Sequence, residues 1–180
     1  MLANIKKLSE FFVYICGILL FTSVLMISIE VILRKFFLIS FGGADEISGY
    51  ILGISITWSL SYVLFEKMHI RIDIIYTKVS FQIQKIFDLI ALLFTFSFVA
   101  ILTYFSYDVI STSIIKNSAA NTPLATPLWI PQFLWGFGLA FFLVVISILL
   151  FEAFKTVITK KDNSYTDILK DEIQVIKDEL

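Results

Sequence analysis

The residues best able to do chemistry are charged groups at the edges of apolar stretches. Glu30 and Arg34 lie four residues apart, which places them on one face of a helix in the order that favours an ion pair. Two interpretations stay open: a surface pair that contributes little, or a pair buried against a neighbouring helix or partner subunit. Asp45 and Glu46 are adjacent acids. They suit a helix N-terminus, where carboxylates offset the dipole, and could also meet a partner such as Arg34.

A second group of polar residues alternates along the chain. His69, Arg71 and Asp73 are separated by isoleucines and follow the second long apolar stretch. A lone histidine in such a place can anchor a loop by hydrogen bonds, or it can act as a ligand or a switch. Asp73 can pair with Arg71 or cap a following helix.

The chain lacks the residues that most catalytic sites need. A single histidine excludes paired-histidine haem ligation within one chain, and a single cysteine, Cys16, excludes a dithiol oxidoreductase. There is no glycine-rich phosphate loop and no nucleophile elbow. Asp45 and Glu46 have no third carboxylate nearby in sequence to complete a metal site. We therefore predict no catalytic residue, metal or cofactor, and a net charge of −1 without a basic stripe predicts no nucleic-acid partner.

The elements that carry these residues are long apolar stretches. The chain has 180 residues, of which 58% are hydrophobic and 16% charged, whereas a soluble domain has about 45–50% apolar and 25% charged residues. A bilayer core needs roughly 20 apolar residues in a helix. Four stretches reach that length, at residues 11–33, 47–65, 86–107 and 128–154. The sequence thus predicts an all-α integral membrane domain over residues 1–160 with four transmembrane helices, and a short cytoplasmic tail at 161–180.

Charge predicts the orientation of these helices. Given four spans, eleven of the 14 lysines and arginines lie in the N-terminal segment, the loop between spans two and three, and the tail. The positive-inside rule therefore predicts that both termini are cytoplasmic. Residues 72–86 are amphipathic, and this indicates either an interfacial helix or an extension of span three. A signal peptide is disfavoured because residues 11–29 exceed the length of its apolar region.

Small residues and prolines mark two further positions. Gly49 and Gly53 form a small-xxx-small pair, which lets helix backbones approach closely, either within this chain or with a partner. Pro127 and Pro131 bracket the start of the fourth span, where a missing amide hydrogen is tolerated.

Taken in order, these motifs are similar to a known family. Arg34 follows the first span, Asp45 and Glu46 open the second, and a His-x-Arg-x-Asp signature at residues 69–73 follows it. The segment of residues 122–131 before the last span is also similar. Over about residues 5–155, the chain resembles the DctQ-type small permease subunit of tripartite ATP-independent periplasmic (TRAP) transporters. Residues 59–64 depart from the family pattern, because serine and bulky residues replace its usual small residues.

This resemblance implies a division of labour within a bacterial inner-membrane complex. A periplasmic substrate-binding protein captures an organic acid such as sialic acid or a dicarboxylate. A large membrane subunit carries the solute with sodium, and the small subunit scaffolds it and helps to dock the binding protein. The resemblance also implies that its motif residues serve structure or subunit contact: Arg34, Asp45, Glu46, His69, Arg71 and Asp73. We expect the same role of Glu30, Gly49, Gly53, Pro127 and Pro131.

The competing hypothesis is a self-sufficient channel or carrier that works as a small oligomer. It would need polar side chains along a shared pathway, and the spans offer only serines and threonines, among them Thr57, Ser61 and Thr95. No charged residue lies at mid-depth, where ion-coupled carriers usually place acids. The sequence therefore favours a subunit that moves no solute alone.

Overall fold

The computed structural model describes residues 2–40, 42–66 and 81–159, and these residues form four helices. The helices are α1 (Leu2–Phe37), α2 (Ala44–Phe65), α4 (Phe81–Ile115) and α5 (Trp129–Thr159). Each is long and apolar enough to cross a membrane. Within the described ranges no residue belongs to a β-strand. For the described residues, the prediction of an all-α fold with four helices able to span a bilayer is confirmed.

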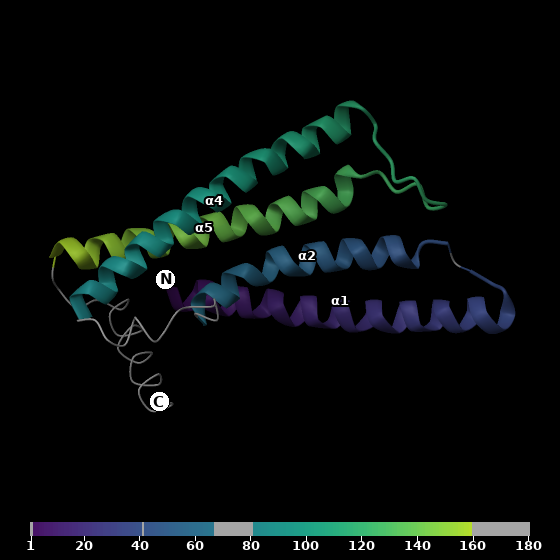
Figure 1. The fold of residues 1–180 in the computed structure, drawn as a ribbon, viewed down its shortest axis with the longest axis horizontal. Helices are drawn as coiled ribbons and strands as arrows, with labels where there is room; N and C mark the ends of the chain where they lie inside the picture. The colour runs from purple at the N-terminus through teal and green to yellow at the C-terminus, as the bar shows by residue number, and fades with distance from the viewer. Residues whose placement is uncertain (1, 41, 67–80, 160–180) are drawn as a thin grey trace.

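The helices form two helical hairpins, α1–α2 and α4–α5, that pack side by side. The packing order is α1, α2, α5, α4, so that α2 and α5 are the inner helices and α1 and α4 flank them (Figure 1). The first loop (residues 38–43) and the second loop (residues 116–128) lie at the same end of the bundle, which we call the loop end. The N-terminus lies at the opposite end. There, Lys6 near the start of α1 forms an ion pair of 2.6 Å with Glu66, the residue that follows α2. This ion pair joins the two helices of the first hairpin.

Both hairpins are packed along a seven-residue repeat on the outer helix. The buried positions on α1 are Ser9, Cys16, Ser23 and Glu30. Those on α4 include Leu92, Val99, Ser106 and Ser113 at the same spacing, together with Gln84 and Asp88. A seven-residue period keeps one seam facing a neighbouring helix when the pair coils left-handedly. Three of the four α1 residues are small, so the backbones of α1 and α2 can approach closely, and small interface residues are the usual means of packing helices in lipid.

The two hairpins meet through an aromatic cluster between α2 and α5. The indole of Trp58 on α2 lies 4.7 Å from the ring of Phe12 on α1 and 5.6 Å from that of Phe137 on α5, centroid to centroid. Phe12 also contacts Phe141 at 5.2 Å, edge to face. Such geometry is favourable for aromatic rings beyond the area they bury. This cluster makes α1, α2 and α5 a single packed unit.

Helix α4 continues well beyond its apolar stretch and ends in a defined cap. Asn117 adopts a left-handed conformation with φ 47°. The amide of Ser118 donates to the carbonyl of Ser113 at 2.9 Å, and that of Asn117 to Ile114 at 3.2 Å. This bonding pattern is a Schellman motif, in which asparagine tolerates positive φ better than most residues. The cap thus fixes where the second loop begins.

Several predictions concern residues that the structure does not describe. His69, Arg71 and Asp73 lie outside the described residues, as does the tail at 161–180. Residues 81–86 belong to α4, whereas the rest of the amphipathic segment lies outside the described ranges. The interfacial helix therefore stays a prediction, and so does the membrane side on which the termini lie.

Candidate functional site

The most connected polar residue at the loop end is Glu46, in the first turn of α2. Its Oε1 accepts a hydrogen bond of 2.8 Å from the hydroxyl of Tyr50, one turn further along the helix. Its Oε2 accepts a hydrogen bond from the Thr122 hydroxyl in the second loop. Thr126 lies beside the same carboxylate. Glu46 therefore links the first helix hairpin to the second loop, while Asp45 beside it is exposed.

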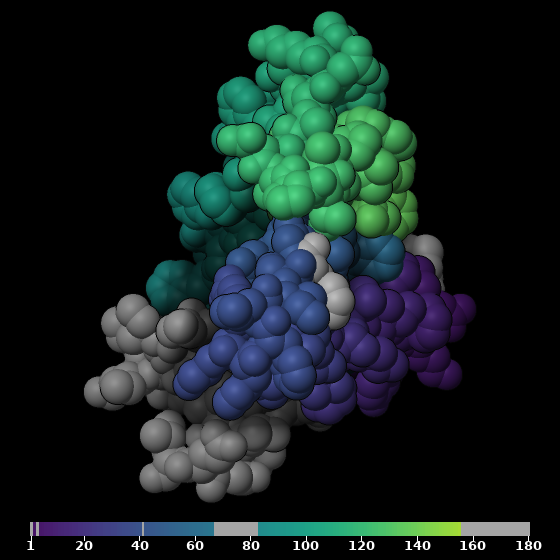
Figure 2. Space-filling model, turned by 90° about the vertical axis from the view of Figure 1, so that its right-hand side faces the viewer, coloured from purple at the N-terminus to yellow at the C-terminus, as the bar shows by residue number. Residues whose placement is uncertain are grey.

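The two loops also meet through apolar contacts that need glycine. An added Cβ at Gly43 would lie 2.1 Å from Cδ1 of Leu124, and one at Gly42 would lie 3.3 Å from Cγ of Pro123. Gly42 has φ 68°, a left-handed conformation that favours glycine. Seen end-on, the second loop rests on the segment between α1 and α2 (Figure 2). The loops of the two hairpins thus form one continuous surface.

Internal hydrogen bonds brace the second loop. The amide of Ala120 donates to the carbonyl of Thr126 at 2.9 Å, and Ala119 and Pro127 form an isolated antiparallel bridge. The amide of Ala125 donates to Thr122 at 3.0 Å, which closes a four-residue turn. Because these bonds fold the loop back on itself, a contact made by Thr122 positions the whole loop.

Glu30 and Arg34 lie in different surroundings. Glu30 is buried, with 5% of its surface exposed, and its Oε1 accepts a hydrogen bond of 2.5 Å from the Ser40 hydroxyl. The same hydroxyl oxygen accepts a hydrogen bond from the Gly42 amide at 3.2 Å. Glu30 therefore holds the first loop against the end of α1. Arg34 is exposed, and among the described residues no ion pair joins it to Glu30.

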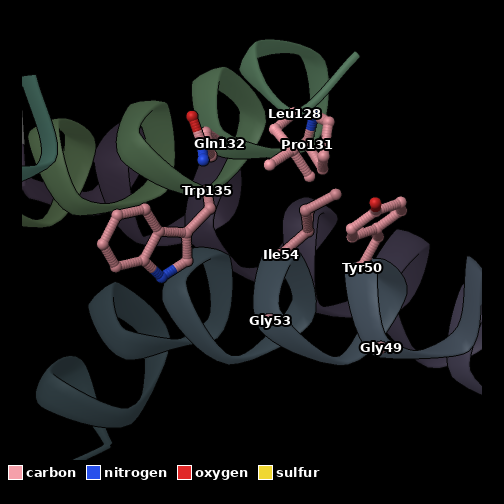
Figure 3. A pocket seen from close by; sticks show the side chains of 8 residues that line it. All are labelled: Gly49, Tyr50, Gly53, Ile54, Leu128, Pro131, Gln132 and Trp135. Carbon is pink, nitrogen blue, oxygen red and sulfur yellow. The ribbon is translucent and has the colours of Figure 1, made fainter. Parts of the chain in front are cut away.

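Gly49 and Gly53 line an apolar groove between α2 and α5. No heavy atom outside their own helix lies within 4 Å of a Cβ added at either glycine. The groove has a volume of about 200 Å³, and Tyr50 and Ile54 of α2 face Leu128, Pro131 and Trp135 across it (Figure 3). The pair thus gives no close helix contact within the described chain, and a contact with a partner stays a prediction. Pro127 precedes α5, and Pro131 lies in its first turn, buried.

The close approach between helices occurs instead at Gly138. A Cβ there would lie 2.5 Å from both Oγ1 of Thr57 and Cδ1 of Trp58. The indole Nε1 of Trp58 donates a hydrogen bond of 2.8 Å to the carbonyl of Leu134 on α5. On the other side of α5, a Cβ at Gly136 would lie 2.9 Å from Cδ1 of Ile110 on α4. Sequence reasoning missed this junction, although glycines two apart on a helix face nearly opposite directions and indicate a helix packed on both sides.

These observations define the class of the protein. It is a helical membrane protein whose described charged side chains lie toward the ends of the helices, while large apolar side chains cover the outer helices. Among the described residues no group of three or more histidines, cysteines or acids could hold a metal ion. Such a chain has the features of a membrane-embedded component of a larger system.

A comparison with protein families gives the particular kind of component. The model of the family described as "Tripartite ATP-independent periplasmic transporters, DctQ component" matches residues 23–156. The chain belongs to this family, which confirms the resemblance drawn from its motifs. It is the small membrane subunit of a TRAP transporter, and this family is a transporter component rather than a family of enzymes. No curated protein and no solved structure matches the chain.

Proposed function

We propose that this subunit is a scaffold: it binds the large substrate-translocating subunit through its apolar faces and helps to dock a periplasmic substrate-binding protein. The complex would take up an organic acid, such as sialic acid or a dicarboxylate, together with sodium. The main support is the exposure of large apolar side chains along the outer helices. Examples are Phe11, Phe21 and Phe36 on α1, and Phe94, Tyr104 and Ile115 on α4, all more than half exposed.

The proposed orientation follows from the charge distribution. Both termini would be cytoplasmic in the bacterial inner membrane, so that the loop end faces the periplasm. The continuous surface formed by the two loops is then available to a periplasmic partner. Exposed apolar faces at membrane depth meet either lipid or another helix, so the same chain can be laterally bound while its loop end stays accessible.

Co-purification tests the scaffold proposal directly. From native membranes solubilised in mild detergent, the tagged chain should recover a larger multi-span membrane protein in equal amount. Reconstituted alone in liposomes it should move no organic acid, whereas addition of the large subunit and the binding protein should give sodium-dependent uptake. Recovery of a defined homo-oligomer that conducts or transports alone would instead support the channel or carrier hypothesis.

Arg34→Ala should weaken the complex while leaving the chain folded. Arg34 is exposed at the end of α1, and among the described residues no ion pair joins it to an acidic side chain that the substitution would leave unpaired. A guanidinium is suited to a carboxylate on a partner because its planar donors match that group. We expect several-fold lower recovery of the large subunit in the pull-down. The matched control is Lys35→Ala, which removes the same charge from the adjacent position. Lys35 Nζ lies 5.9 Å from the centroid of the Phe36 ring within this chain, so its loss should leave recovery of the large subunit unchanged. Equal recovery in both variants and the parent chain would contradict the proposal.

A further inference from the structure

The two hairpins are joined at two separate levels. Midway along the helices, Gly138 lets α5 approach Thr57 and Trp58 of α2 closely. At the loop end, Glu46 and the glycines of the first loop contact the second loop. Between these levels lies the apolar groove, which has a volume of about 200 Å³ (Figure 3). The separation of the hairpins above the groove therefore depends on the contacts between the loops.

The polar contact between the two hairpins at the loop end is made by the Glu46 carboxylate. Both oxygens of Glu46 are engaged, one by Tyr50 from its own helix and the other by Thr122 from the opposite hairpin, and Thr126 of that hairpin lies beside the same carboxylate. Tyr50 also lines the groove. The Glu46 carboxylate thus connects the groove wall, the start of α2 and the second loop. The apolar contacts of Pro123 with Gly42 and of Leu124 with Gly43 lie next to this carboxylate.

We propose that Glu46 and Thr122 form a clasp that holds the two hairpins together at the loop end and sets the width of the groove beneath it. With the clasp closed, the two loops present one preassembled surface. With the clasp open, the hairpins pivot about the junction at Gly138, the loops part and the groove widens. Glu46 is then a positioning residue within this chain, and this role is separate from any direct contact with another subunit.

The second loop can transmit this contact because it is internally braced. Its turn and bridge hold Thr122 in fixed relation to the start of α5. The first loop is held in turn by Glu30 through Ser40. Each side of the clasp therefore moves with its own hairpin. This inference does not rest on the proposed scaffold function, since it concerns a distance within one chain.

Spin labels on the two hairpins can measure the clasp in the full-length chain in lipid nanodiscs. Cysteines would replace Leu38 and Ile115, which are 91% and 79% exposed, in a Cys16→Ala background. Double electron–electron resonance should give one narrow distance distribution for this parent. Glu46→Ala should lengthen the mean distance and broaden the distribution. Thr122→Val combined with Thr126→Val, which removes both hydroxyls beside the carboxylate, should do the same, and adding this pair to Glu46→Ala should have no further effect.

Asp45→Ala is the matched control, because it removes the same charge from the adjacent, exposed position. It should leave the distribution of the parent unchanged. A parent-like distribution in both Glu46→Ala and the threonine-to-valine pair at 122 and 126 would overturn the clasp. So would an equal change in Asp45→Ala, because the effect would then be one of charge. If Glu46→Ala does not fold, the pair of threonine substitutions decides the question alone. A failed pull-down would leave all these outcomes unaffected, so the two proposals fail separately.

Discussion

Gly138→Ala is expected to push α2 and α5 apart and to destabilise the chain by about 1–3 kcal/mol, the usual cost of overpacking a close contact. The added methyl would lie 2.5 Å from Oγ1 of Thr57. That oxygen cannot turn away freely, because it donates to the carbonyl of Ile54 at 3.0 Å. Unfolding in mixed detergent micelles, followed by tryptophan fluorescence, would measure the loss.

The same substitution elsewhere on the inner helices provides the comparison. At Gly53 an added methyl meets no atom outside its own helix within 4 Å. Gly53→Ala should therefore leave stability within about 0.5 kcal/mol of the parent, as surface substitutions usually do. If Gly53→Ala nevertheless lowers recovery of the large subunit, the groove is a partner contact. Equal stability of the two variants would show that the close approach at Gly138 is not needed.

Trp58→Ala should also destabilise the chain strongly, with a loss of about 2 kcal/mol or more by comparison with large-to-small substitutions elsewhere. The indole touches α1 through Phe12 and α5 through Phe137, so its removal opens a space where three helices meet. We expect a lower unfolding midpoint in the same detergent assay. The variant should also let the hairpins separate more easily than the parent.

Trp58→Phe separates the contribution of ring packing to stability from that of the hydrogen bond. Phenylalanine keeps most of the ring contacts but cannot donate to the carbonyl of Leu134. A hydrogen bond between membrane helices contributes about 0.6 kcal/mol on average. We expect a loss near that value, well short of the loss for Trp58→Ala. If the two variants lose the same amount, the bond rather than the aromatic packing stabilises the junction.

The helices could be predicted from sequence because their signal is compositional. Each needs only an apolar run of bilayer length, and the four runs were enough to predict the four helices of the described residues and their all-α class. The family could be predicted for a related reason, since its motifs occur in a fixed order at the ends of those runs. The ends of the helices differ from the predicted bounds. Both α1 and α4 continue beyond their apolar runs, because a helix can satisfy its backbone hydrogen bonds through polar turns as well.

The arrangement of the helices was harder to predict because it depends on single close contacts. Gly49 and Gly53 carried the expected spacing but face a groove, whereas Gly138, with no such partner four residues away, makes the approach. The partner of Glu46 is Thr122, 76 residues away, which no local pattern indicates. The heptad of buried residues from Ser9 to Glu30 was present in the sequence and could have identified the face of α1 that packs on α2.

The row of two hairpins has a consequence for how the protein is made. Helices that adjoin in the chain also adjoin in space within each hairpin, so α1 and α2 can pair while α4 and α5 are still being synthesised. The inner helices dock last, through contacts that link residues far apart in sequence. A defect at that junction would therefore leave two inserted hairpins that have failed to dock, a species that membrane quality control would have to distinguish from the finished subunit.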